Sequence, residues 1–117
     1  MKIIDFNKPF VTLEDKKYVD HVFRNNKYAD GYFQKQCENF IRKKIKSKFV
    51  ALTQSCTSAL EIVMILINLK KDDEVIMPSY TFTSTANAVL LRGAKPVFAD
   101  VNLDDANLDF KSVKKKN

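Results

Sequence analysis

The 117 residues are 45% hydrophobic, which is typical of a globular domain and argues against intrinsic disorder. The net charge of +6 would suit an acidic partner, but four of the positive charges belong to the C-terminal lysines Lys111, Lys114, Lys115 and Lys116. No zinc-ligand spacing, RNA-binding aromatic motif or helix-turn-helix signature accompanies the charge, so we expect no nucleic-acid partner and no metal.

Two amphipathic helices are predicted in the first half of the chain. Thr12 and Asp15 have the spacing of a capping box, and the apolar stripe that follows predicts a helix over residues 13–25. A second apolar stripe follows Gly31 and predicts a helix that ends near Lys46. We expect the basic run at its end to be a solvated face: Arg42, Lys43, Lys44, Lys46 and Lys48.

Strands and helices alternate in the second half. We predict strands over 49–53, 74–77 and 97–99, and helices over 59–69 and 84–92. Pro78 stops the second strand, Gly93 ends the last of these helices, and Asp109 is an expected N-cap for a further helix. This alternation predicts an α/β fold with a parallel sheet, and we count residues 1–117 as one domain or part of one.

The most apolar run, Ile62–Ile67, is too short to span a bilayer and predicts a buried helix, so we expect no membrane association. Residues 1–10 include Asp5 and Asn7 where a signal peptide needs an apolar core. We therefore expect a cytoplasmic protein in which Cys37 and Cys56 are free thiols.

Two places carry residues suited to ligand binding. The polar segment 53–59 lies between a predicted strand and a predicted helix, where free N–H groups favour a phosphate. Taken alone, its Ser and Thr residues are more often helix caps, and an aromatic residue after a strand, such as Phe82, is more often part of a core. His21 has no partner at a suggestive spacing, so we expect it at the surface.

Several motifs together indicate a family. Residues 77–87 read Met-Pro-Ser-Tyr-Thr-Phe-Thr-Ser-Thr-Ala-Asn, residues 55–57 read Ser-Cys-Thr, and an Asp-Gly-x-Phe turn begins at Asp30. These motifs have the order and separation seen in the sugar aminotransferases of the DegT/DnrJ/EryC1/StrS family. The chain closely resembles those enzymes from about Ile4 to Phe110. The resemblance is greatest to the dTDP-4-amino-4,6-dideoxygalactose transaminases.

The resemblance implies the N-terminal part of the large domain of a fold-type-I aminotransferase, with an incomplete sheet, and pyridoxal 5'-phosphate as the cofactor. Cys56 and Thr57 match the pair that holds the cofactor phosphate, with Cys56 as a small filler and not a nucleophile. Phe82 matches the aromatic residue that stacks on the cofactor ring. The turn at Asp30 would lie near the active site.

The complete enzyme implied by the resemblance is a homodimer that moves an amino group, with glutamate as the expected donor, to a dTDP-linked 4-keto-6-deoxyhexose. Its role would be in surface polysaccharide biosynthesis. The Schiff-base lysine is expected beyond Asn117, so residues 1–117 contain no catalytic residue and should be inactive alone. The alternative is a non-enzymatic module that binds a phosphate ligand or a sugar nucleotide.

Overall fold

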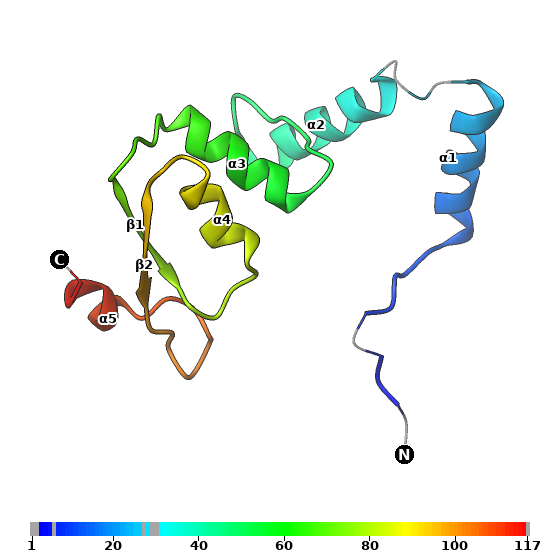
Figure 1. The fold of residues 1–117 in the computed structure, drawn as a ribbon. Coiled ribbons are helices and arrows are strands. Elements are labelled where there is room, and N and C mark those ends of the chain that lie inside the picture. The colour runs from blue at the N-terminus through cyan, green and yellow to red at the C-terminus, as the bar shows by residue number, and fades with distance from the viewer. Residues whose placement is uncertain (1–2, 6, 27, 29–30, 117) are drawn as a thin grey trace. The chain divides into compact units, whose positions relative to one another are not determined.

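The structure is a computed structural model, and it describes residues 3–5, 7–26, 28 and 31–116 (Figure 1). The chain divides into two compact units, Met1–Leu52 and Thr53–Asn117, which we describe separately as the first and second units.

The first helix of the first unit, α1, spans Leu13–Arg24 and is fixed by the capping box that the sequence predicts. The Thr12 hydroxyl accepts a hydrogen bond from the Asp15 amide (3.1 Å), and the Asp15 carboxylate accepts one from the Thr12 amide (2.7 Å). These reciprocal bonds satisfy two amides that have no acceptor inside the helix. Both the helix and its cap are therefore confirmed.

The second helix, α2, spans Tyr32–Ile45 and is also confirmed. Gly31 precedes it with a φ of 70°, a left-handed conformation that glycine adopts without a Cβ clash. Lys46 ends the helix in the same region of backbone space, and the basic residues around it are exposed. Asp30 lies outside the described residues.

The predicted strand over 49–53 is wrong. No residue of this segment pairs with either described strand, and Phe49 is 87% exposed. An apolar run becomes a strand only when a neighbouring backbone supplies its hydrogen bonds, and this segment has no such neighbour among the described residues. It is held instead by α2, because the Leu52 amide donates to the Glu38 carboxylate at 3.2 Å.

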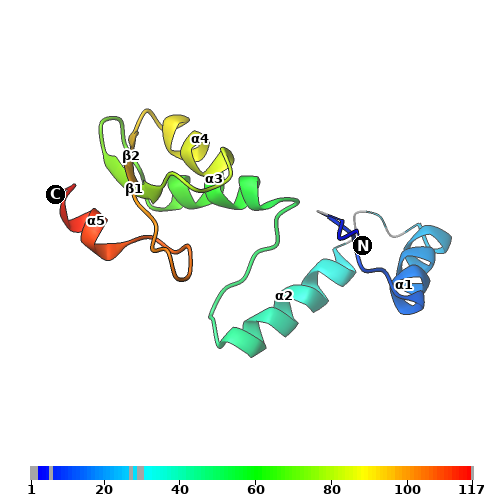
Figure 2. The ribbon, with the colours of Figure 1, turned by 90° about the horizontal axis from the view of Figure 1, so that it is seen from below.

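The second unit contains a two-stranded parallel sheet, which confirms the predicted α/β class (Figures 1 and 2). β1 (Glu74–Pro78) and β2 (Lys95–Ala99) pair from Glu74↔Lys95 to Pro78↔Ala99. Pro78 is the last residue of its strand, where a missing amide donor disrupts the ladder least. Helix α4 (Ser84–Leu90) connects the strands, as a parallel crossover requires.

Helix α3 spans Cys56–Leu66, so it begins and ends three residues earlier than predicted. It begins earlier because Ser55 is the N-cap and its hydroxyl accepts from the Ser58 amide at 3.1 Å. It ends earlier because Asn68 adopts a positive φ of 56°, which turns the chain out of the helix. Leu69 is thereby free to enter the core.

The core of the second unit is small. It consists of Leu69, Met77, Val89 and Ala94, against which Met64, Val75 and Ala86 pack. Val89, on α4, is the largest side chain that is fully buried among the described residues. Because α4 contacts both β2 and α3, it joins the sheet to α3.

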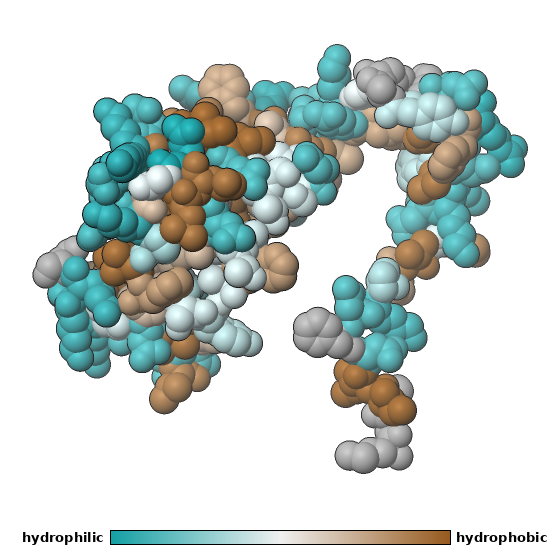
Figure 3. All heavy atoms as spheres, viewed as in Figure 1, coloured by the Kyte–Doolittle hydropathy of each residue, from teal (hydrophilic) through white to brown (hydrophobic). Residues whose placement is uncertain are grey.

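The predicted burial of Ile62–Ile67 is wrong. Met64 packs on the core, but the neighbouring side chains are exposed, with Leu66 at 77%. Figure 3 shows apolar side chains on the surface over α3 and α4. Among the described elements of this unit, α4 is the one that packs extensively on α3, so most of the apolar helix faces solvent.

The second unit ends with a turn and a short helix. After α4, Arg92 and Gly93 donate to the carbonyls of Val89 and Leu90, which tightens the last turn, so the helix ends two residues before the predicted Arg92. Asp109 caps α5 (Phe110–Lys114) as predicted, accepting from the amides of Lys111 and Ser112. Within the described ranges, no helix is long and apolar enough to cross a membrane.

Candidate functional site

The predicted phosphate-binding pair lies at the start of α3. Helix geometry leaves the amides of Cys56 and Thr57 without an acceptor inside the helix, whereas the Ser58 amide is used by Ser55. The Thr53 hydroxyl donates to the Ser55 carbonyl at 2.8 Å and fixes the approach to the helix. Two free amides at the positive end of a helix dipole are suited to an anion.

Thr57 is half-buried at this end, and Cys56 is exposed. The Cys56 side chain is not part of the described core. The Cys56 amide remains available at the helix start, which is the group that a phosphate would contact.

A hollow of about 340 Å³ lies between α3 and α4, next to Thr57. It is lined by Thr57, Glu61, Ser84, Asn87, Leu90 and Leu91. The carboxylate of Glu61 lies one helical turn beyond Thr57 and would repel a phosphate deeper in the hollow. An anion is therefore favoured only at the N-terminal end of α3.

The aromatic candidate, Phe82, lies in the loop between β1 and α4. It is 75% exposed, and so its ring is free to stack on a planar ligand. The loop is held by hydrogen bonds from the Thr81 amide to the Ser79 carbonyl (3.1 Å) and from the Thr85 amide to the Phe82 carbonyl (3.0 Å). The side chain of Tyr80 in the same loop is exposed to a similar degree.

All three predicted cofactor residues belong to the second unit. Figure 1 shows β1 and β2 running in the same direction and α3 running in roughly the opposite direction to β1. The N-terminus of α3 and the loop after β1 therefore lie toward the same end of the unit, beyond the carboxyl ends of the strands, where parallel sheets commonly bind ligands. The residues present fit a ligand with a phosphate and a flat ring.

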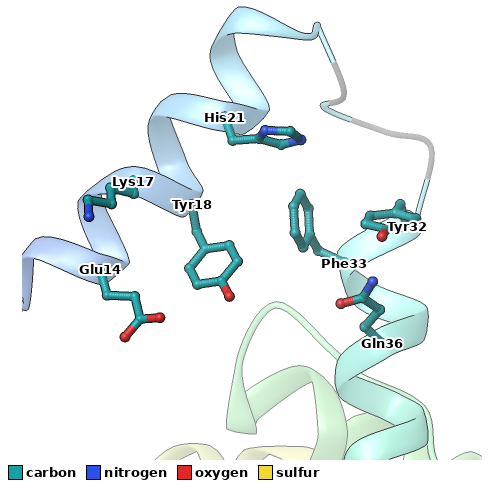
Figure 4. A pocket seen from close by; sticks show the side chains of 7 residues that line it. All are labelled: Glu14, Lys17, Tyr18, His21, Tyr32, Phe33 and Gln36. Carbon is teal, nitrogen blue, oxygen red and sulfur yellow. The ribbon is translucent and has the colours of Figure 1, made fainter.

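A hollow of about 510 Å³ in the first unit is lined partly by aromatic side chains, and this cluster was not predicted from the sequence. Figure 4 shows the Phe33 ring between the Tyr18 and His21 rings of α1 and the Tyr32 ring of α2. Its ring makes edge-to-face contacts with Tyr18, His21 and Tyr32 at centroid distances of 6.0, 5.9 and 5.1 Å. His21 is exposed, as expected, although it has this ring contact.

Glu38 makes polar contacts that were not predicted from the sequence. The side-chain amide of Gln34 donates to its carboxylate at 2.9 Å, and the Leu52 amide does so at 3.2 Å. These bonds, the Gln34 bond above all, hold the pKa of Glu38 below its ordinary value. Spacing suggests the Gln34 pair, which is four residues apart on a helix, but not the pair with Leu52.

No group of three His, Cys, Asp or Glu side chains in the described part of the chain is placed to hold a metal ion.

Comparison with known proteins places these residues in a family. The DegT/DnrJ/EryC1/StrS aminotransferase family matches residues 10–116. A UDP-2-acetamido-2-deoxy-3-oxo-D-glucuronate aminotransferase of Pseudomonas aeruginosa is 31% identical over 111 residues, which are 93% of this chain and 31% of the relative.

Solved structures agree with this match. An aminotransferase from Psychrobacter cryohalolentis superposes with a TM-score of 0.84 at 28% identity, covering 92% of this chain and 28% of the other. NtdA from Bacillus subtilis, solved with bound cofactor PMP, has a TM-score of 0.77 at 29% identity, covering 86% and 23%.

These matches confirm the predicted fold class, since the described fold corresponds to part of known aminotransferase structures. The first curated relatives are much longer, and the matched regions are 18–31% of their length. The chain belongs to the DegT/DnrJ/EryC1/StrS aminotransferase family.

Proposed function

We propose that residues 1–117 form the N-terminal portion of the cofactor-binding domain of a pyridoxal-phosphate-dependent sugar-nucleotide aminotransferase. The family match and the PMP-bound relative support the aminotransferase class. The observation that carries the proposal is structural: the start of α3, where the amides of Cys56 and Thr57 are free, and the loop after β1, which contains the exposed Phe82, lie toward the same end of the second unit.

Each residue has a defined part in this proposal. The amides of Cys56 and Thr57, with the Thr57 hydroxyl, bind the cofactor phosphate, and Phe82 orients the cofactor ring and shields one face from water. The bound cofactor supplies an electron sink for amino-group transfer. The exposed lysines of the described chain do not contribute to this step.

For the whole protein, we propose that the acceptor is a dTDP-linked 4-keto-6-deoxyhexose and that glutamate is the amino donor. The Ser-Cys-Thr sequence at 55–57 and the Asp-Gly-x-Phe turn support this subgroup. The P. aeruginosa relative, which is named for another nucleotide-linked keto sugar, supports the wider substrate class. We place this protein in the cytoplasm as a homodimer that serves surface polysaccharide synthesis.

We further propose that residues 1–117 alone do not catalyse transamination. A Schiff-base lysine must be neutral, which requires a desolvated or cation-flanked pocket, whereas every described lysine is exposed. Turnover of a keto-sugar nucleotide by the purified 117-residue chain would contradict this.

Binding measurements with two probes test the cofactor site. Calorimetric titration of the 117-residue chain with pyridoxal phosphate and with inorganic phosphate should detect both ligands. Thr57→Val should weaken both, because it removes a phosphate donor. Phe82→Ala should weaken only pyridoxal phosphate, because phosphate has no ring to stack.

Phe110→Ala is the matched control, since Phe110 is an exposed phenylalanine on α5. It should change neither affinity. If Phe82→Ala and Phe110→Ala have the same effect on pyridoxal phosphate binding, the assigned role of Phe82 is wrong. If the chain binds neither pyridoxal phosphate nor inorganic phosphate, the proposed site is wrong.

A further inference from the structure

The hollow between α3 and α4 in the second unit is lined by polar side chains to which the proposed function gives no part. Figures 1 and 2 show the two helices side by side, and they are in contact. Apart from Thr57, the lining consists of Glu61 on α3 and of Ser84, Asn87, Leu90 and Leu91.

Ser84, the first residue of α4, has a buried hydroxyl group that is not used inside the protein. The residue is only 9% exposed, yet its hydroxyl has no hydrogen-bond partner among the described residues, whereas the nearby hydroxyls of Thr81 and Thr85 bond to each other at 3.0 Å. In the described part of the chain, no fully buried side-chain oxygen or nitrogen lacks a partner. The Ser84 oxygen is therefore still accessible, and the hollow that Ser84 lines gives access to it.

Glu61 is half-buried and is the one charged side chain in the described lining of the hollow. Two cations of the second unit are used elsewhere: Lys95 pairs with Asp72 at 3.2 Å, and Arg92 donates to a backbone carbonyl. No described residue forms an ion pair or hydrogen bond with the Glu61 carboxylate. A partly desolvated carboxylate without a cation partner attracts positive charge.

The chemistry of the lining selects the class of ligand. Glu61, Ser84 and Asn87 supply three side chains with oxygen acceptors, and the Asn87 side chain also has no partner among the described residues. A primary ammonium group carries one positive charge and three N–H donors, which matches this set. A divalent metal ion favours several carboxylates, and the lining has one.

We propose that the hollow between α3 and α4 binds the primary ammonium group of a small organic molecule, with Glu61, Ser84 and Asn87 as acceptors. Leu90 and Leu91 give the hollow an apolar side that suits the carbon skeleton of such a molecule. This site goes beyond the proposed function and does not depend on it. The carboxylate that attracts an ammonium group in the hollow also keeps a phosphate at the N-terminal end of α3.

NMR titration of the 117-residue chain with methylammonium chloride tests the site. At constant ionic strength, we expect saturable shifts at the Asn87 side-chain amide and at the backbone amides of Glu61 and Ser84. Tetramethylammonium is the matched ligand control, because it has the same charge but no N–H donor. It should bind several-fold more weakly than methylammonium.

Three variants test the assigned acceptors. Glu61→Gln should weaken methylammonium binding roughly tenfold, because it removes the charged acceptor. Ser84→Ala should weaken it by a smaller factor, because it removes a neutral one. Glu74→Gln is the matched control, since Glu74 is an exposed carboxylate on β1, and it should leave the affinity unchanged. Circular dichroism checks the fold of each variant.

The outcomes are distinct from those of the cofactor test. If methylammonium causes no saturable shift, or binds no better than tetramethylammonium, the hollow is not an ammonium site. Equal losses in Glu61→Gln and Glu74→Gln would also overturn the proposal, even if Ser84→Ala does not fold. Glu61→Gln should not weaken the binding of inorganic phosphate, and a wild-type chain that binds methylammonium but no phosphate would refute the proposed function alone.

Discussion

Val89 is fully buried, and its position on α4 places it where the helix meets the small core. Val89→Ala should lower the free energy of unfolding by about 2 kcal/mol, because it removes buried methyl groups and leaves a cavity. Thermal unfolding followed by circular dichroism measures this loss. Leu103→Ala is the control, since Leu103 is 97% exposed, and an equal loss in both variants would contradict the assigned core.

Gly93 has a left-handed backbone conformation that restricts substitution in the second unit. Its φ is +73°, and an added Cβ would meet Lys71 only at an ordinary contact distance of 3.5 Å. The cost of Gly93→Ala is therefore conformational, and we expect a destabilisation of about 1 kcal/mol in chemical denaturation. Gly93→Asn should cost less, because asparagine tolerates the left-handed region better than alanine. Equal costs for the two variants would contradict a purely backbone origin.

At the scale of elements, the capping box of α1 makes the start of this helix sensitive to acid. Backbone and side-chain hydrogen bonds from Thr12 hold the pKa of Asp15 below its ordinary value. A depressed carboxyl pKa stabilises the helix above the pKa of the unfolded chain, and this contribution is lost as pH falls through the folded pKa.

Acidification should therefore lower the protection of the Thr12 amide, measured as its hydrogen-exchange rate relative to the intrinsic rate at each pH, with a midpoint below the ordinary pKa of aspartate. Asp15→Ala should lack this protection at all pH values, and Glu14→Ala should behave as the wild type. A Thr12 amide whose protection does not change with pH would show that the carboxylate does not hold the helix start.

The elements that sequence predicts well are those fixed by neighbouring residues. The caps at Thr12 and Asp109 depend on side chains within three positions, and both are confirmed. The segment 49–53 was mistaken for a strand because strand formation depends on a partner that composition does not reveal. The prediction that α3 is buried was wrong for a similar reason. Apolar composition shows which surface favours burial but not whether a second surface covers it.

The same distinction applies to the candidate site. The family motifs indicated Cys56, Thr57 and Phe82, and the structure places them in one unit. Their binding role remains a proposal. Glu38 escaped prediction because its contact with Leu52 crosses a long stretch of chain.

At the scale of the whole molecule, exposed apolar side chains dominate the expected solution behaviour. Leu66 on α3 is 77% exposed, whereas Met64 on the same helix packs on the core. Leu66→Lys should reduce self-association while preserving the fold, because it adds a charge to an open apolar surface. Sedimentation velocity and circular dichroism measure the two effects.

Met64→Lys is the matched comparison on that helix. It should unfold the second unit, because it places a charge against the core. If both lysine variants unfold the protein, the surface around Leu66 is not open in solution. If neither reduces association, the exposed face of α3 is not its cause.

The crossover from β1 through α4 to β2 also has a consequence for protein synthesis. The strand pairing itself lies between Glu74 and Ala99, so this sheet closes over a short stretch of chain and can form soon after Ala99 leaves the ribosome. The exposed apolar face of α3 emerges earlier than either strand. The core-facing side of α3, at Met64, is therefore uncovered until α4 and the strands are made, and slowing elongation after Ile67 should lengthen its exposure.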